Sequence, residues 1–438
     1  MRRWLAGWLL GLPALLAAAS GPDFTLHRLE GREPGPTLLV IGGIQGDEPG
    51  GFHAASLLVT DYRIERGHLW VVPNLNFPSI LARTRGVHGD MNRKFADIRP
   101  DDPEYAAVQK IKRIILDPQV DVVLNLHDGS GFYRPHHVDR LHNPRRWGQS
   151  VIIDQAELPG VVHGNLAGLA ARVRAFVNAR EPRPEYRFHV RNTRTREGDA
   201  EMEKTLTYFA IRHGKPAFGI EASKTFLTHR RARYHLLAVE GFMHALGIRH
   251  RRDFPLTAEA VRRRIDANLR LALYDARILL DVSGGARARL GYIPMPPDRP
   301  LAFTASNPLL AIVGERDRYR VRYGNRHVTL LEPQYFEFDD SLKRIMLEVD
   351  GERREVSPGS LVPVRGGFRV APLAGYRVNV IGFRRPGRRD ESGVLIRRQD
   401  IASRFSVDRQ GRRYRVEFYR GSRFSGMVLV EFAASSGA

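Results

Sequence analysis

Short apolar runs and longer amphipathic segments alternate along residues 36–247. The apolar runs predict strands at Leu38–Ile41, His68–Pro73, Val120–Leu126 and Ala217–Ile220. Between them, helical spacing is found at Gly51–Val59, Glu104–Leu116, Val162–Val177 and Thr228–Leu246. This alternation is typical of an α/β domain with a mixed, mainly parallel sheet flanked by helices.

The pattern changes after Arg249. Leu256–Leu280 predicts one amphipathic helix, with Thr257 as its cap and Glu259 in its first turn. From Leu280 onward, short β-runs are separated by Gly, Pro and Asp, which predicts one or two small β-sandwich or barrel modules. These runs are Tyr319–Tyr323, His327–Leu331, Arg344–Val349, Tyr376–Phe383, Arg413–Tyr419 and Gly426–Phe432.

Turn chemistry suggests where this β-rich part divides. The stretch DGERREVSPG, which begins at Asp350, interrupts the strand pattern and predicts a boundary near Asp350–Pro358. Taken together, these patterns and the N-terminal features described next predict a signal peptide over residues 1–20 and an α/β domain over 21–250. A linker helix with a β-rich domain follows over 251–350, and a sandwich-like β-domain over 351–438.

The first twenty residues have the features of a secretory signal. Arg2 and Arg3 precede the apolar stretch Trp4–Leu16, and Ala17–Ala19 provides the small residues that a signal peptidase needs. The apolar stretch is short for a bilayer span. The sequence thus predicts a periplasmic protein with a cleaved signal and no stable membrane anchor.

The chain is strongly basic and has no cysteine. Its 69 Lys and Arg residues exceed its 48 Asp and Glu residues, so the formal net charge is +21. Such a surface attracts polyanions, but no nucleic-acid-binding module is recognisable and export argues against nucleic acid as a partner. Affinity for an anionic cell envelope and an arginine-rich solvated surface are equally good interpretations. Without cysteine, a zinc site must use His, Asp, Glu or another oxygen ligand.

Polar residues with metal-binding chemistry follow three predicted strands. LLVIGGIQGDEPGG places Gln45 and Glu48 three residues apart after the first, NLHDGSG places His127 at another, and FGIEASK contains Glu221. Ligands bind at the carboxyl ends of strands in such folds, where we also expect Asn76. A hydrolytic zinc site needs three protein ligands and an open position. Gln45, Glu48 and His127 would supply the three, with Asp128 as a candidate supporting residue.

Each of these residues also has an ordinary structural interpretation. Asp47 and Glu48 could only complement a helix start, and His127 could be a satisfied residue at a strand end. In a chain rich in arginine, Arg85 and Arg93 could be surface charges. An unpaired carboxylate at Glu221, however, would be costly among apolar neighbours. The combination and order of these residues favour a site.

These motifs resemble the carboxypeptidase-A-like zinc metallocarboxypeptidase superfamily. The chain is more narrowly similar to the bacterial cell-shape-determining peptidoglycan D,L-carboxypeptidases. Those enzymes also have glutamine in place of the first histidine ligand, and they also add β-rich modules after the catalytic domain. The motifs that carry the resemblance lie within residues 41–224.

The resemblance implies roles for ten residues and one Zn²⁺ ion. It implies Gln45, Glu48 and His127 as metal ligands, Arg85 as oxyanion stabiliser, Glu221 as general base, Asn92 and Arg93 as the grip on the terminal carboxylate, and Trp147, Thr207 and Lys224 as pocket lining. The guanidinium fork of arginine suits a carboxylate, and a glutamate can pass a water proton to a leaving amine.

The implied substrate is a muramyl peptide of peptidoglycan. The enzyme would trim the stem tripeptide to a dipeptide by releasing meso-diaminopimelate and so influence cell shape, and the β-modules would offer surfaces to other cell-wall proteins. One alternative is an N-acyl amino acid deacylase of the aspartoacylase and succinylglutamate desuccinylase type, which shares the GGIQGDEPGG signature. Another is a non-catalytic wall-binding protein whose metal site has decayed at Gln45.

Overall fold

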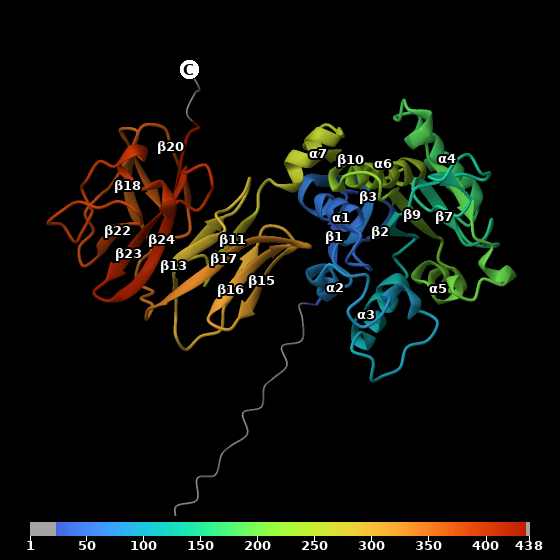
Figure 1. Cartoon of the computed structure of the whole chain (residues 1–438), viewed down its shortest axis with the longest axis horizontal. Coiled ribbons are helices and arrows are strands. Elements are labelled where there is room, and N and C mark those ends of the chain that lie inside the picture. The colour runs from blue at the N-terminus through green and yellow to red at the C-terminus, as the bar shows by residue number, and fades with distance from the viewer. Residues whose placement is uncertain (1–22, 435–438) are drawn as a thin grey trace, which may run out of the picture.

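The computed structural model describes residues 23–434. The predicted signal peptide lies outside the described residues. Figure 1 shows an α/β domain on one side and the β-rich remainder of the chain on the other, with α7 near the junction.

A mixed, mainly parallel sheet forms the α/β domain. Its strand order is β1 (His27–Glu30), β3 (Tyr62–Val72), β2 (Glu33–Ile41), β4 (Val122–Gly129), β9 (Ala217–Ser223), β7 (Ser150–Ile153) and β8 (His189–Asn192), with β10 (Arg249–Arg252) also paired to β3. The pairs β2–β3, β2–β4, β4–β9 and β7–β8 are parallel. The predicted fold class is confirmed.

Helices lie on both sides of this sheet (Figure 1). They are α1 (Pro49–Asp61), α4 (Leu166–Asn178) and α6 (Thr228–Leu246) on one side, and α2 (Phe77–Ala82), α3 (Tyr105–Ile115) and α5 (Leu206–Arg212) on the other. The sheet is therefore covered on both faces, and β4 is buried along its whole length. Helix α4 begins later than expected, because Oδ1 of Asn165 accepts the backbone N–H of Gly168 and caps it there.

The register of the parallel strands sets where the predicted site residues meet. Ile41 at the end of β2 pairs with Asn125 of β4, and His127 pairs with Glu221 of β9. The loop that follows β2 carries Gln45 and Glu48 past the same sheet edge.

The single helix predicted over Leu256–Leu280 is wrong. Helix α7 (Ala258–Ile265) is capped by Thr257 as expected, but β11 (Arg270–Leu273) and β12 (Ile278–Asp281) follow it as an antiparallel hairpin. Tyr274, Asp275 and Ala276 form its turn with positive φ. The fully buried Leu271, Leu273, Ile278 and Leu280 recur with the period of two that belongs to strands.

The β-rich part consists of small sheets. The first sheets contain β11, β12 and β14 (Phe303–Ala305), and β13 (Arg289–Met295), β15 (Leu310–Glu315), β16 (Arg318–Tyr323) and β17 (Arg326–Tyr335). The later ones contain β18 (Ile345–Val349), β19 (Glu352–Val356) and β21 (Phe368–Val370), and β20 (Leu361–Val364), β22 (Arg377–Val380), β23 (Arg413–Arg420) and β24 (Arg423–Phe432).

Hydrophobic packing shows how this part is organised. A cluster of buried apolar side chains runs from Leu342 to Phe432 and is separate from the larger cluster that begins in the α/β domain. The predicted division at residues 350 and 351 falls on the turn that joins β18 to β19. This hairpin lies inside the second cluster.

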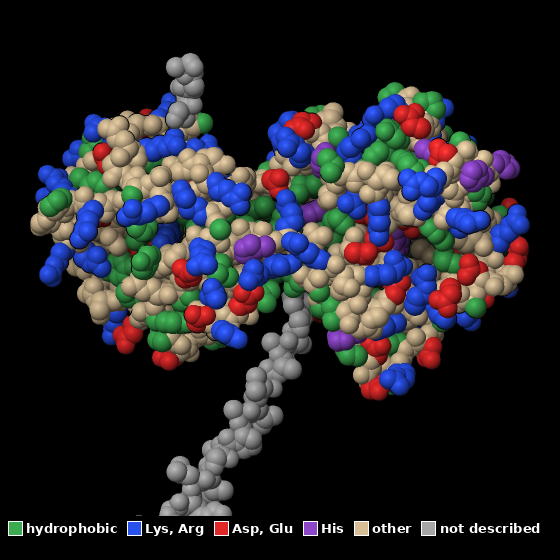
Figure 2. All heavy atoms as spheres, viewed as in Figure 1, with side chains coloured by type: hydrophobic (Ala, Val, Ile, Leu, Met, Phe, Trp, Pro, Cys, Tyr) green, Lys and Arg blue, Asp and Glu red, His purple; other side chains and the backbone are tan. Residues whose placement is uncertain are grey.

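The surface carries basic side chains on both lobes. Figure 2 shows Lys and Arg distributed over the α/β domain and the β-modules alike, with Asp and Glu among them. Among residues 23–434, no helix combines the length and apolar character that a bilayer span requires.

Candidate active site

One cavity of about 300 Å³ collects the predicted site residues at the carboxyl ends of β2, β4 and β9. All ten residues assigned roles from the sequence line it: Gln45, Glu48, Arg85, Asn92, Arg93, His127, Trp147, Thr207, Glu221 and Lys224. Asn76 is not among the lining residues. Its Oδ1 caps α2, and its Nδ2 donates to Glu104.

Two of the three predicted metal ligands, Gln45 and Glu48, contact the third, His127, inside this cavity. Nδ1 of His127 lies 3.2 Å from Oε1 of Gln45 and 3.0 Å from Oε2 of Glu48. Burial opposes protonation of His127, but the Glu48 carboxylate outweighs it and raises the histidine pKa above its usual value. Because a metal-binding histidine must be neutral, a cation would displace this proton.

The donor set fits a zinc ion. A tetrahedral zinc with bonds of about 2.0–2.1 Å separates its ligand atoms by about 3.3 Å, close to the spacings seen here. Within residues 23–434 no group of three His, Asp or Glu side chains is arranged to hold a metal. In such a site the third donor would be the amide oxygen of Gln45, which lies 3.2 Å from Nδ1 of His127.

The tight turn before α1 positions Glu48. This residue stands at the N-cap of α1, yet its side chain makes no cap bond; instead, Oε2 accepts the backbone N–H of Asp128 at 3.1 Å. The carboxylate of Asp128 caps the helix in its place by accepting the N–H of Gly50. A Cβ at Gly50 would lie 2.4 Å from that carboxylate, so only glycine fits. The carboxylate of Glu48 therefore does more than complement a helix start, because it also contacts His127 and the backbone of Asp128.

Asp128 also ties α6 to the end of β4. Its fully buried carboxylate accepts from Arg231 at 2.7 Å and pairs with Nε2 of His235 at 3.1 Å. These contacts, together with that to Gly50, lower its pKa although burial opposes ionisation. Asp128 thus supports the site in two ways: its own backbone N–H donates to Glu48, and its carboxylate holds the start of α1 and the side chains of Arg231 and His235.

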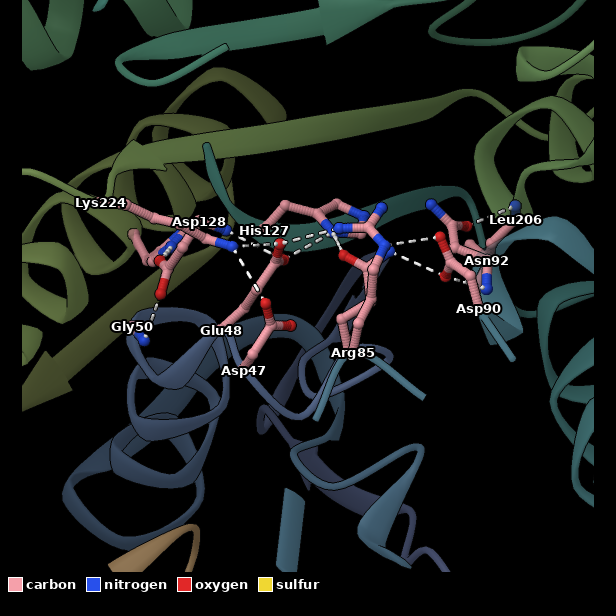
Figure 3. A network of polar contacts seen from close by, with 12 residues as sticks. Asp47, Glu48, Gly50, Arg85, Asp90, Asn92, His127, Asp128, Leu206 and Lys224 are labelled. Carbon is pink, nitrogen blue, oxygen red and sulfur yellow. Dashed lines mark hydrogen bonds and ion pairs between the residues drawn. The ribbon is translucent and has the colours of Figure 1, made fainter. Parts of the chain in front are cut away.

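A second carboxylate, Asp90, joins the other side of the site. Its Oδ1 accepts from Nε2 of Gln45 at 2.8 Å and from the backbone of Asn92, and its Oδ2 accepts from Nε of Arg85 at 2.9 Å. Burial acts against ionisation, but these hydrogen bonds and the charge of Arg85 lower the pKa of Asp90. Figure 3 shows the network running from Lys224 through Glu48 and Arg85 to Asp90 and Asn92.

Asn92 and Arg93 lie on the short 3₁₀ helix Met91–Arg93, at one end of this network. Oδ1 of Asn92 accepts the backbone N–H of Leu206, whereas its Nδ2 has no hydrogen-bond partner among the described residues. The guanidinium of Arg93 lies 3.4 Å from Glu201, whose side chain is mostly exposed. Both donors can therefore be offered to a ligand carboxylate at small cost.

The remaining pocket residues surround the ligands. The Trp147 ring stacks under Arg191 at 3.7 Å, and the hydroxyl of Thr207 lies 3.2 Å from that of Thr205. Nζ of Lys224 is 3.3 Å from both Asp47 and Glu48. Lys224 thus lines the pocket and also contacts a predicted metal ligand, Glu48.

Glu221 is the electrostatic exception. Its Oε2 is buried and has no hydrogen-bond partner within the described part of the chain. Burial raises its pKa to about 8, the nearby Glu48 adds to the shift, and His127 and Lys224 oppose it. An unpaired buried carboxyl aimed at a cavity has the properties expected of a proton acceptor whose partner is a ligand or water.

Asp90 is the main residue that the sequence interpretation missed. It stands inside the segment GVHGDMNR, two residues before Asn92, which is a common position for a capping aspartate. That signal would have predicted the cap. It could not have predicted the contacts with Gln45 and Arg85.

Comparison with known proteins shows the family to which this chain is similar. Residues 1–266 match the catalytic region of a family described as the carboxypeptidase controlling helical cell shape, and residues 338–433 match the C-terminal domain of metallo-carboxypeptidase. The product-bound cell shape determinant protein Csd4 from Helicobacter pylori is 39% identical, with 94% of this chain and 100% of that chain covered and a TM-score of 0.84.

Two further relatives extend the comparison. The mDAP-bound form of Helicobacter pylori Csd4, described as a D,L-carboxypeptidase, is 40% identical over 91% of this chain and 97% of its own, with a TM-score of 0.83. N-alpha-acetyl-L-2,4-diaminobutyric acid deacetylase from Halomonas elongata is 39% identical over 106 residues. That match covers only 22% of this chain and 30% of the deacetylase.

The family match spans more than half of the chain, and the Csd4 structures align along almost all of it. The predicted resemblance is therefore confirmed, and the non-catalytic interpretation is set aside. The chain belongs to the family of metallo-carboxypeptidases that control helical cell shape.

Proposed function

We propose that this carboxypeptidase is a periplasmic, zinc-dependent enzyme that converts the stem tripeptide of peptidoglycan to a dipeptide by releasing meso-diaminopimelate. The observation that carries the proposal is the shared cavity, in which a ligand set, an unpaired carboxyl and two carboxylate-binding side chains face one space. The tripeptide-bound and mDAP-bound structures of Helicobacter pylori Csd4 supply the substrate class.

The site residues divide the chemistry among them. Arg93 and Nδ2 of Asn92 hold the terminal carboxylate, which restricts cleavage to the last residue. A single zinc ion held by Gln45, Glu48 and His127 would supply Lewis acidity. Glu221 takes a proton from water as the water oxygen bonds to the scissile carbonyl carbon. Glu221 then returns this proton to the amine nitrogen as the C–N bond breaks. Arg85 offsets the charge that develops on the carbonyl oxygen.

A muropeptide assay tests the proposal. The mature protein, loaded with zinc or stripped by a chelator, is incubated with muramyl tripeptide, and the products are read by mass. We expect muramyl dipeptide and free meso-diaminopimelate only with metal present. Release of acetate from N-acetyl-diaminobutyrate, with the tripeptide left intact, would favour the deacylase instead.

The carboxylate grip gives a second expected result. Arg93→Ala removes a charge-assisted contact worth roughly 2–4 kcal/mol, so kcat/KM should fall about 30- to 1000-fold. Amidating the terminal carboxylate of the tripeptide should lower kcat/KM of the wild-type enzyme by a similar factor. The same amidation should lower kcat/KM of Arg93→Ala only slightly further. Arg99→Ala, at an arginine whose side chain is 80% exposed, is the matched control. Equal wild-type turnover of acid and amide would contradict the role.

Export follows from the N-terminal pattern, and we propose it on that ground. Cell fractionation followed by N-terminal sequencing should find a mature periplasmic chain that starts near Ala19 or Ser20. A full-length chain confined to the cytoplasm would separate the enzyme from its proposed substrate.

A further inference from the structure

A glutamine ligand poses a problem that a histidine ligand does not. The end of its side chain has one group with lone pairs, the carbonyl oxygen, and one without, the NH₂ group. A rotation of half a turn about the last side-chain bond exchanges the two groups with almost no change in shape. Gln45 can therefore bind a cation only if its surroundings hold the oxygen inward.

Asp90 provides that constraint. Both of its carboxylate oxygens act as acceptors, Oδ1 for Nε2 of Gln45 at 2.8 Å and for the backbone N–H of Asn92 at 3.0 Å, and Oδ2 for Arg85 at 2.9 Å. The NH₂ group of Gln45 must face this carboxylate, because the reversed amide would place one oxygen against another. Its Oε1 is thereby directed at Nδ1 of His127, 3.2 Å away.

Asp90 is itself held firmly. Its side chain is only 17% exposed and caps the 3₁₀ helix Met91–Arg93, so it cannot follow a rotating amide. The same carboxylate orients Arg85. The position of one aspartate therefore couples the amide ligand to the arginine beside it.

We propose that Asp90 is the positioning residue that makes Gln45 a metal ligand, by holding its amide with the oxygen toward His127 and Glu48. The inference rests on the proposed metal site. It predicts that the contribution of Asp90 to metal binding depends on whether residue 45 is an amide.

A double-mutant cycle on zinc affinity tests this dependence. The dissociation constant for zinc is measured by competition with a chromogenic chelator in the wild type, Asp90→Asn, Gln45→Glu and the double variant. In the glutamine background, Asp90→Asn should weaken zinc binding about 10- to 100-fold, as outer residues of metal sites commonly do. In the Gln45→Glu background, Asp90→Asn should cause no loss of zinc affinity. A carboxylate at position 45 presents an oxygen in either orientation, and removing the charge of Asp90 also removes a repulsion between two carboxylates.

Two further variants guard against a purely structural effect. Asp90→Ser keeps an oxygen that can cap the 3₁₀ helix, and should weaken zinc binding as Asp90→Asn does. Asp102→Asn is the matched control, since Asp102 also accepts a backbone N–H two residues on, from Glu104, and pairs with Lys94 outside the cavity. Its zinc affinity should equal that of the wild type.

The possible outcomes distinguish the role of Asp90 from the existence of the metal site itself. Unchanged zinc affinity in folded Asp90→Asn and Asp90→Ser overturns the inference, and so does an equal loss in the amide and carboxylate backgrounds. If the wild type itself binds no zinc, the proposed metal site fails, and the inference fails with it. A loss confined to the amide background supports the inference.

Discussion

Replacing Glu221 with glutamine is expected to lower tripeptide turnover by about two to four orders of magnitude, with zinc content and tripeptide affinity retained. The variant keeps the shape of the side chain but cannot accept a proton. Glu221 lies beside His127 in the strand register, and its buried Oε2 has no hydrogen-bond partner among the described residues, so no other bond depends on the carboxyl. Turnover is measured by single-turnover kinetics, and zinc content by elemental analysis.

A buried carboxyl elsewhere provides the control. Glu417→Gln also removes a carboxyl whose pKa is raised by burial, but this residue lies in β23, outside the cavity, and its loss should leave turnover unchanged. Zinc loss in Glu221→Gln would make Glu221 a ligand. Near-normal turnover would remove it from the mechanism.

The raised pKa of Glu221 also predicts a pH effect on the metal-free protein. The folded state keeps a proton up to a pKa of about 8, whereas the unfolded chain releases it near 4.5, so folding stability should fall as pH rises between these values. Glu221→Gln removes this loss. The thermal midpoint of the metal-free variant should exceed that of the wild type at pH 8, but not at pH 4.

Removing a carboxylate or imidazole ligand should have the largest effect on the amount of zinc that the protein retains. His127→Ala or Glu48→Ala leaves two protein ligands, so both variants should lose bound zinc and tripeptide turnover. Both side chains are nearly buried and meet at 3.0 Å, so no neighbouring residue can take their place without moving the chain. Metal content after dialysis against trace zinc is the measurement.

Two matched variants sharpen this test. Gln45→His should keep or raise zinc affinity, because imidazole binds zinc more strongly than an amide oxygen does. His136→Ala removes an exposed histidine from a neighbouring loop and should change nothing. Full zinc content in both His127→Ala and Glu48→Ala would place the metal elsewhere.

Much of the fold could be predicted locally, because its elements carry their own signals. Helix α6 has the bounds that its periodicity predicts, and the strands from Leu38, Val120 and Ala217 lie close to where their apolar runs stand. The failure at Leu256–Leu280 has a physical cause. Alternation over four residues is too short to separate the period of a strand from that of a helix, and the pairing of β11 with β12 and β14 decides the outcome.

The sequence by itself determined which residues reach the active edge of this protein. Parallel strands end at one edge of the sheet. Once the three strands were recognised, Gln45, His127 and Glu221 could therefore be predicted to meet at that edge. Only the tertiary structure decided how these side chains are oriented. Gln45 and Asp90 are 45 positions apart, and a hydrogen bond between them depends on two loops being folded against each other. Local patterns record the period of burial, whereas the direction of an amide depends on the partner that folding places beside it.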